Sequence, residues 1–217
     1  MKALLLSVRP EHALNILQGN KTLELRKSVP KWFKGWVYVY VTKGKRYLAT
    51  SFSTNDDGYT YIDGYYLTNW NKEPFILNGT IPFRFWFDEY EEIKYEVILP
   101  NGYENYDGVW VDSSSYGYWI SEHITEKSML NDEELEQYGK GKDLYAWHIK
   151  NLDIFDKPMQ LGEFTTTQIP NNAIIEKSGE GMPYFYIKER RSWHMYFSYL
   201  TKAPQSYMFV YVKEELK

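Results

Sequence analysis

Apolar and polar residues alternate with a period of two along much of the chain, and this pattern predicts a protein built mostly from short strands. In residues 36–42, valines at every second position alternate with Trp36, Tyr38 and Tyr40, which predicts a strand with two different faces. Turn-forming pairs such as Asn78-Gly79 separate the segments. Many short strands with frequent turns are typical of a β-barrel or a β-sandwich. Other strands are predicted at residues 2–8, 21–27, 46–53, 60–67, 80–88, 93–99, 116–120, 144–151 and 205–213.

Two short helices are predicted between these strands. Residues 10–18 have a proline in their first turn and end at Gly19, a residue that often terminates helices. Asn131 can cap a second helix, whose first turn is acidic and which we expect to end at Gly139. A loop bounded by Pro158 is expected after strand 144–151. The predicted fold class is therefore mixed α+β, with strands in the majority.

The composition points to one intracellular domain. The 217 residues are 43% hydrophobic, which is enough for a conventional core, and no linker-like stretch interrupts them, so we expect a single domain over residues 1–217. No cysteine occurs, which excludes disulfides and thiolate chemistry. No stretch resembles a secretory signal or is long enough to span a bilayer, so we expect a cytoplasmic protein without a membrane partner.

The histidines are scattered, and none forms a pair at the spacing of metal ligands on a helix. We therefore expect no metal site and no cofactor. His148 lies in a predicted strand, where a histidine is more often a satisfied core residue than a general base. The four histidines are His12, His123, His148 and His194.

Charge is distributed unevenly along the chain. The net charge of −4 argues against a protein that coats duplex DNA. Residues 1–50, however, contain ten Lys and Arg against two acids. A local basic site on an acidic body suits an anionic ligand such as a phosphate or a short single strand. The alternative is that a basic part simply packs against an acidic part.

Residues 19–27 hold the densest set of potential binding groups. In a strand, the two leucines point to one side, and Glu24 and Arg26 point to the other, about 7 Å apart at the usual strand rise. Lys21 would enter the strand at its rim. The alternative is an exposed strand with an ordinary surface Glu–Arg pair, a weak interaction. The predicted ligand-binding residues are Lys21, Thr22, Glu24, Arg26 and Lys27.

The same stretch carries a family resemblance. Gly19, Lys21, Glu24 and Arg26 fill the pattern Gly-x-Lys-x-x-Glu-x-Arg, which resembles the signature of the ASCH domain family, a β-barrel fold similar to PUA domains. The chain resembles in particular ASCH-type proteins of phages and low-GC Gram-positive bacteria, over about two thirds of its length. The resemblance implies an ASCH/PUA-like β-barrel with a few short helices and a divergent or inserted β-rich segment at about residues 165–200. The agreeing stretches are residues 1–44, 78–79, 145–149, 156–158 and 202–206.

The resemblance implies binding of RNA, single-stranded nucleic acid or a modified nucleotide in a basic cleft of the barrel. Lys21 and Arg26 would contact phosphate or base acceptors, and Glu24 would accept from a base amino group or hold Arg26 in position. We therefore lean towards a binding protein rather than an enzyme.

A hydrolase is the first alternative, either a nucleoside amidohydrolase or a ribonuclease-like enzyme of the ASCH type. A branch of the family deacetylates acetylated cytidine with a Lys, a Thr and a Glu, and Lys21 corresponds to that lysine. The threonine position is occupied by Glu24, and Glu126 would have to supply the remaining carboxylate. A lysine beside a carboxylate is expected to keep its proton, which weakens it as a base.

A second alternative is a phage-encoded protein that acts on a host protein through residues 165–200. Within residues 183–197, aromatic and basic residues interleave, as in grooves that bind single-stranded nucleic acid. The other interpretation is a hairpin whose Phe185 and Ile187 fill the core. The residues of this possible second nucleic-acid contact surface are Lys188, Arg190, Arg191 and Trp193.

Overall fold

The structure is a computed structural model in which 3 short α-helices accompany many strands among the described residues. It confirms the predicted mixed α+β class. Contacts divide the chain into two compact units: unit 1 is Met1–Leu17, Gly35–Trp86 and Asn151–Lys217, and unit 2 is Gln18–Lys34 and Phe87–Lys150. The single domain expected over residues 1–217 stays a prediction. The described residues are 2–49, 64–66, 76–99, 102–104, 110–112, 115–118, 122–170, 173–187 and 195–212.

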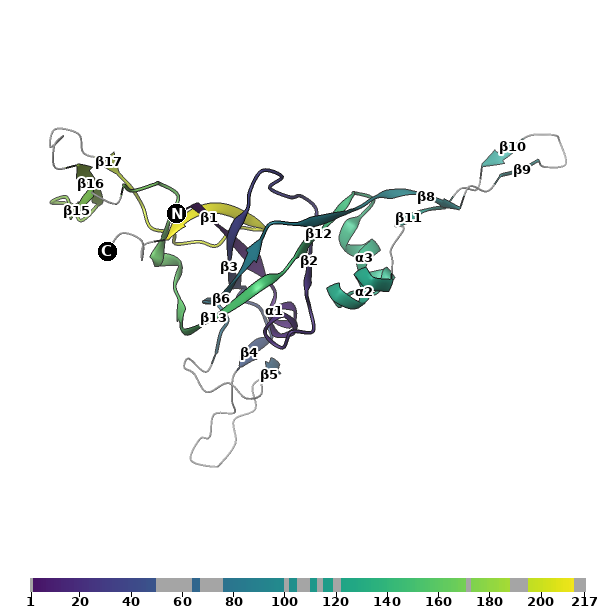
Figure 1. Cartoon of the computed structure of the whole chain (residues 1–217), viewed down its shortest axis with the longest axis horizontal. Helices are drawn as coiled ribbons and strands as arrows, with labels where there is room; N and C mark the ends of the chain where they lie inside the picture. The colour runs from purple at the N-terminus through teal and green to yellow at the C-terminus, as the bar shows by residue number, and fades with distance from the viewer. Residues whose placement is uncertain are drawn as a thin grey trace, which may run out of the picture. The chain divides into compact units, whose positions relative to one another are not determined.

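Unit 1 contains a six-stranded sheet with the order β13-β6-β3-β1-β18-β14 (Figure 1). β1 pairs in parallel with β3 and antiparallel with β18. This order has two ends, so the pairings of the described residues do not close the predicted barrel. The strands are β1 (Lys2–Val8), β3 (Gly35–Val41), β6 (Ile81–Phe87), β13 (Lys150–Met159), β14 (Phe164–Thr165) and β18 (Tyr207–Val212).

The alternation in β3 does not separate a buried face from an exposed one. Tyr38 and Tyr40 are buried, like the valines between them. Tyr38 packs edge-on against Phe164, with ring centroids 5.2 Å apart, and lies 6.0 Å from Phe155. Both faces of the strand are covered by other residues, which explains why large aromatic side chains occupy one face and valines the other. The core cluster of this region is Ala3, Leu5, Tyr38, Tyr40, Ile81, Met159, Phe164, Val210 and Val212.

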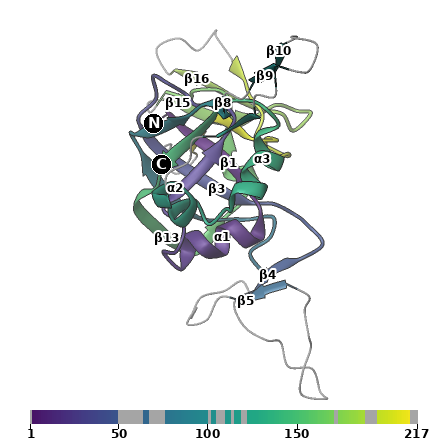
Figure 2. The same cartoon turned by 90° about the vertical axis from the view of Figure 1, so that its right-hand side faces the viewer.

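Helix α1 (Pro10–Leu17) contacts β3, β4 (Tyr47–Ala49) and β5 (Gly64–Tyr66) of the same unit (Figure 2). It ends one residue earlier than predicted, and Gly19 follows with a φ of +77°, a conformation that glycine adopts at little cost. Ala13 and Ile16 are fully buried. The proline in the first turn and Gly19 after the last one therefore predicted this helix correctly to within one residue.

The C-terminal part of unit 1 adds a 3₁₀ turn, η1 (Leu161–Glu163), and a small sheet, β15-β16-β17. Phe185 is buried against Phe197, as the hairpin interpretation expects, and Ile187 is half-buried. Lys188, Arg190, Arg191 and Trp193, the predicted second contact surface, lie outside the described residues. The insertion proposed at residues 165–200 stays a prediction. The strands are β15 (Ala173–Lys177), β16 (Pro183–Ile187) and β17 (Met195–Tyr196).

Unit 2 is organised around the three-stranded sheet β2-β12-β7, with α2 and α3 beside it (Figure 1). Leu23 and Leu25 of β2 join a core that includes Ile124 of α2 and Leu135 of α3. Two further strand pairs, β8-β11 and β9-β10, belong to this unit. The elements are β2 (Leu23–Arg26), β7 (Tyr90–Ile93), β8 (Tyr95–Leu99), β9 (Gly102–Glu104), β10 (Trp110–Asp112), β11 (Ser115–Tyr118), α2 (Glu122–Ser128), α3 (Asp132–Gly139) and β12 (Leu144–His148).

The start of α3 is as predicted. The Glu134 amide donates to the Asn131 side chain over 2.9 Å, and the Asn131 amide donates to the Glu134 carboxylate over 3.0 Å, which completes a capping box. Gly139 is the last helical residue rather than the one after it, and Lys140 follows in the left-handed region. A Cβ at position 139 would overlap the Tyr118 hydroxyl, so any other residue there would force the Tyr118 ring to move.

Two details of the sequence analysis are corrected. Pro158 lies inside β13, not in a loop, and β13 is an end strand of its sheet, where a missing amide donor is tolerated. Helix α2 was not predicted.

Within the described residues, no helix has the length and apolar character needed to cross a membrane.

Candidate functional site

Strand β2 and the residues just before it bring together the three charged residues of the motif. The Arg26 guanidinium lies 2.8 Å from one carboxylate oxygen of Glu24, and the Lys21 ammonium lies 3.4 Å from the other. Lys21 also donates to the Ser128 carbonyl over 2.6 Å. Lys21, Glu24 and Arg26 are called the charged cluster below.

The end of α2 fixes the cluster in place. The Thr22 amide donates to the Lys127 carbonyl over 2.9 Å, next to the carbonyl that holds Lys21. The carbonyl of the same residue, Thr22, accepts from the Ile149 amide over 2.9 Å. A cation at the C-terminal end of a helix is favourable because carbonyl oxygens gather there.

The face of β2 that was expected to be open is largely buried. Lys21 is 2% exposed and Glu24 4%, and the Arg26 side chain is 12% exposed. Thr22 and Lys27, on either side of β2, are exposed, and the Lys27 ammonium lies 5.2 Å from the centre of the Tyr138 ring. Of the cluster, Arg26 is therefore the member most accessible to a ligand.

Burial lowers the pKa of Lys21 below its ordinary value, and the opposing effect of the Glu24 carboxylate does not outweigh it. The sequence analysis considered only the carboxylate and expected Lys21 to hold its proton firmly. Desolvation penalises the ammonium form, so Lys21 gives up its proton more readily than an exposed lysine.

Aromatic residues share the sheet face with Glu24 and Arg26. In the β2–β12 register, Trp147 lies opposite Glu24, and Tyr145 lies opposite Arg26. Directly opposed residues project to the same side of an antiparallel pair. On β7, Tyr90 lies opposite Trp147, and its ring meets Tyr145 edge-on with centroids 5.9 Å apart. The guanidinium thus lies on a face that also presents two tyrosines.

The segment after β2 contains a residue that the sequence analysis missed. Trp32 is 99% exposed, in residues 27–34, a segment with three lysines and no acid. The adjacent Phe33 stacks on Phe87, with ring planes 11° apart. The signal in the sequence was a tryptophan and a phenylalanine between lysines, outside any alternating pattern.

The opposite side of β12 carries His148. Its Nε2 lies 2.9 Å from the Glu91 carboxylate, and His123 Nε2 lies 3.4 Å from the same oxygen. His148 therefore has a partner, as expected of a satisfied histidine. In the part of the chain that the structure describes, no group of three or more His, Cys, Asp or Glu is arranged to hold a metal ion.

The side chain of Glu126 is exposed on α2 and is not part of the charged cluster. The cluster instead receives the backbone carbonyl of Ser128. The catalytic arrangement considered for Lys21, Glu24 and Glu126 thus places one carboxylate in the interior and the other at the surface.

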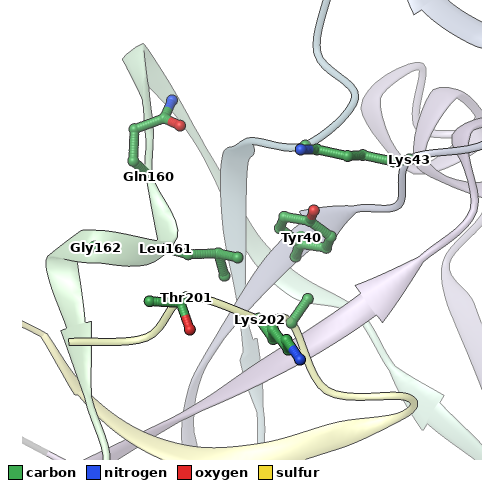
Figure 3. A pocket seen from close by; sticks show the side chains of 9 residues that line it. Tyr40, Lys43, Gln160, Leu161, Gly162, Thr201 and Lys202 are labelled. Atoms are coloured by element: carbon green, nitrogen blue, oxygen red, sulfur yellow. The ribbon is translucent and has the colours of Figure 1, made fainter. Parts of the chain in front are cut away.

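Unit 1 has a pocket of its own, with a cavity volume of about 440 Å³ (Figure 3). Figure 3 shows Lys43 reaching above the Tyr40 hydroxyl, with Lys202 across the pocket from it. Burial raises the pKa of Tyr40, so its hydroxyl stays protonated. The pocket is lined by Tyr40, Lys43, Gly79, Gln160, Leu161, Gly162, Thr201, Lys202 and Ala203.

Unit 1 also holds a partly buried cation, Arg84. It donates to Asp153 and to the Tyr38 hydroxyl, each over 2.8 Å. The guanidinium carbon lies 4.2 Å from the centre of the Trp36 ring. The guanidinium thus links β6 to both neighbouring strands, β13 and β3, which indicates a structural role.

Comparisons with known proteins add little at the level of sequence. No profile of a protein family matches the chain, and no curated protein matches it. The solved structure of ASCH from Zymomonas mobilis is 14% identical, covers 98% of this chain and 90% of its own, and gives a TM-score of 0.46. A single-residue variant of that protein is 13% identical, with coverages of 99% and 94% and a TM-score of 0.46. These values do not assign this chain to a family.

Proposed function

We propose that unit 2 binds RNA, another single-stranded nucleic acid or a nucleotide at the Arg26 end of the β2-β12-β7 face. The observation that carries the proposal is the setting of Arg26, whose guanidinium is held 2.8 Å from Glu24 on a face shared with Tyr145 and Tyr90. A guanidinium can donate to phosphate or base acceptors, and tyrosine rings can stack on bases.

The members of the charged cluster take different roles in this proposal. Arg26 contacts the ligand. Exposed Lys27, the next residue in the chain, adds a charge, and exposed Thr22, before the start of β2, adds a hydroxyl. Glu24 orients Arg26. Lys21 balances the charge of Glu24 from the interior and anchors it to α2, so it is a positioning residue.

The ASCH resemblance is part of the same proposal. It rests on Gly19, Lys21, Glu24 and Arg26 at the motif spacing. The finer fold, a closed PUA-like barrel, and kinship with phage-encoded ASCH-type proteins belong to it as well.

A titration of a fluorescently labelled single-stranded RNA, followed by anisotropy, tests the proposal. Arg26→Ala is expected to weaken binding about tenfold or more, which is about 1.4 kcal/mol. Arg26→Lys should restore only part of the loss, because an ammonium lacks the planar fork of the guanidinium. Lys140→Ala, an exposed lysine of the same unit, is the matched control and should bind like the wild type.

Unchanged affinity in Arg26→Ala would contradict the proposal, as would the absence of any binding by the wild type. Circular dichroism and melting temperatures of each variant separate lost contacts from lost folding.

A hydrolase is the second candidate, and one observation favours it. Lys21 lies 3.4 Å from Glu24 with its pKa lowered by burial, which moves it towards the neutral amine that a general base requires. Incubation with acetylated cytidine and with short RNA, followed by mass spectrometry, tests for turnover. Product that disappears in Lys21→Met would support this candidate, and no product at high protein concentration would remove it.

A further inference from the structure

Trp32 in unit 2 is 99% exposed. Tryptophan has the largest apolar surface of any side chain and is rarely left this open to water. Lys27, Lys31 and Lys34 in the same segment are also exposed. We call residues 27–34 the Trp32 segment.

The Trp32 segment is held in a defined shape next to the exposed indole. The Lys31 amide donates to the Val29 carbonyl over 3.0 Å, and the Phe33 amide donates to the Pro30 carbonyl over 2.8 Å. The Phe33 ring stacks on Phe87 with a centroid distance of 6.3 Å. Trp32 is therefore presented by an anchored backbone, which lowers the entropy cost of using it as a contact.

The charge of the segment limits what can cover the indole. Three lysines and no acid lie within residues 27–34, and the Glu92 carboxylate lies 3.9 Å from the Lys31 ammonium. A partner must combine negative charge with a flat apolar surface. Single-stranded nucleic acid has both, since its phosphates are anionic and its unpaired bases have accessible faces.

We propose that Trp32 stacks on an unpaired base, which makes the ligand of unit 2 a single strand rather than a duplex. This inference rests on the proposed function, because the strand that lies on Arg26 is the one that reaches Trp32. The two residues are six positions apart, which is at most about 20 Å of extended chain. A base inside a duplex is already stacked on both sides and offers no face to the indole.

The test compares three labelled ligands: a single-stranded RNA, an abasic strand with the same number of phosphates, and the duplex of the same RNA, which has twice as many. Trp32→Ala is expected to weaken binding of the single-stranded RNA about tenfold, because stacking on an aromatic side chain contributes strongly for each base. Its binding to the abasic strand should stay within twofold of the wild type. Trp32→Phe should retain part of the affinity.

Lys34→Ala is the matched control from the same segment. It should weaken the single strand and the abasic strand alike and reduce the dependence of affinity on salt. The exposure of Trp32 means that its replacement should leave the melting temperature unchanged.

The outcomes separate this inference from the function on which it rests. If the wild type binds the single strand and Trp32→Ala binds it equally well, the stacking role is wrong and the proposed function survives. If the wild type binds none of the ligands, both are wrong. Binding of anionic phosphatidylserine vesicles that is lost in Trp32→Ala, without RNA binding, would assign the segment to a membrane surface instead.

Discussion

The charged cluster of unit 2 and the pocket of unit 1 use similar residues in opposite ways. Lys21 is 2% exposed and donates to a backbone carbonyl, whereas Lys43 and Lys202 are exposed at the edge of an open cavity. The cluster belongs to a recognisable motif, and the pocket lysines belong to none that the sequence analysis identified. A functional pattern in a sequence therefore does not by itself indicate which cations are open to a ligand.

Because the two regions differ in burial, replacing a charged residue should cost more stability in the charged cluster than in the pocket. Charges removed from water need partners with good geometry, and losing one partner leaves the others uncompensated. Exposed lysines remain hydrated and can be replaced at little cost. The expected effects of substitutions therefore decrease from the buried region to the open one.

Glu24→Ala is expected to have the largest effect. It would leave buried Lys21 and partly buried Arg26 without the carboxylate that pairs with both, and removal of one partner from a buried ion pair costs about 3–5 kcal/mol. Urea unfolding of the variant and the wild type measures this loss. A loss below about 1 kcal/mol would mean that water reaches the cluster.

Arg84→Ala should have an intermediate effect, because the Arg84 side chain is only partly buried. The variant loses a pair of hydrogen bonds, to Asp153 and Tyr38, and the contact with the Trp36 ring, together about 2 kcal/mol. Chemical unfolding measures it, with Arg84→Lys as the control that keeps the charge and loses the fork. If Arg84→Ala lost as much free energy of unfolding as Glu24→Ala, the partly buried Arg84 and the buried Glu24 would not differ in the way proposed.

Lys21→Met should change how stability depends on pH. Burial lowers the pKa of Lys21 in the folded protein, while the unfolded chain holds this proton up to about pH 10.5. Between those two values the unfolded state binds more protons, so Lys21 makes stability rise with pH, by at most about 1.4 kcal/mol per pH unit. The free energy of unfolding of the wild type should therefore increase relative to that of Lys21→Met as the pH rises through this window.

Unfolding of the two proteins at several pH values up to 10.5 measures that gain, and the tyrosines common to both cancel in the difference. A difference that does not vary with pH would show that Lys21 titrates alike in the folded and unfolded states.

Replacing both Lys43 and Lys202 by Ala should have the smallest effect on folding. Both side chains are exposed, so the free energy of unfolding should change by no more than about 0.5 kcal/mol. Differential scanning fluorimetry checks this, with Lys45→Ala as an exposed control from the same unit. A much larger loss would show that the pocket lysines are structural, like Lys21.

The elements that sequence reasoning predicted well are those with a complete local signal. α3 has a capping box around Asn131, and β3 has a regular alternation from Trp36 onwards. α2 was missed because its only apolar residue is Ile124, so no apolar stripe exists to be read. Its stability comes from packing and from the bonds to β2, which are not local.

The candidate site was predictable in part for the same reason. Alternation correctly placed Glu24 beside Arg26, since strand geometry is local. The burial of Glu24 depends on residues distant in sequence, such as Trp147 opposite it, and no pattern in residues 19–27 contains that information. The tryptophan between lysines was visible in the sequence, but its exposure depends on which residues do not pack against it, and the local pattern does not contain that information. The ligand-binding roles of Lys21, Thr22, Glu24, Arg26 and Lys27 stay predictions.

The hydrogen bonds from the end of α2 to the residues just before β2 have a consequence for dynamics. The carbonyl of Lys127 holds the Thr22 amide, and the carbonyl of Ser128 holds the Lys21 ammonium, so a fluctuation that frays the last turn of α2 releases both at once. The Thr22 amide should then exchange with deuterium through this opening of α2. A ligand that occupies Arg26 would slow that event from the far end of the same strand.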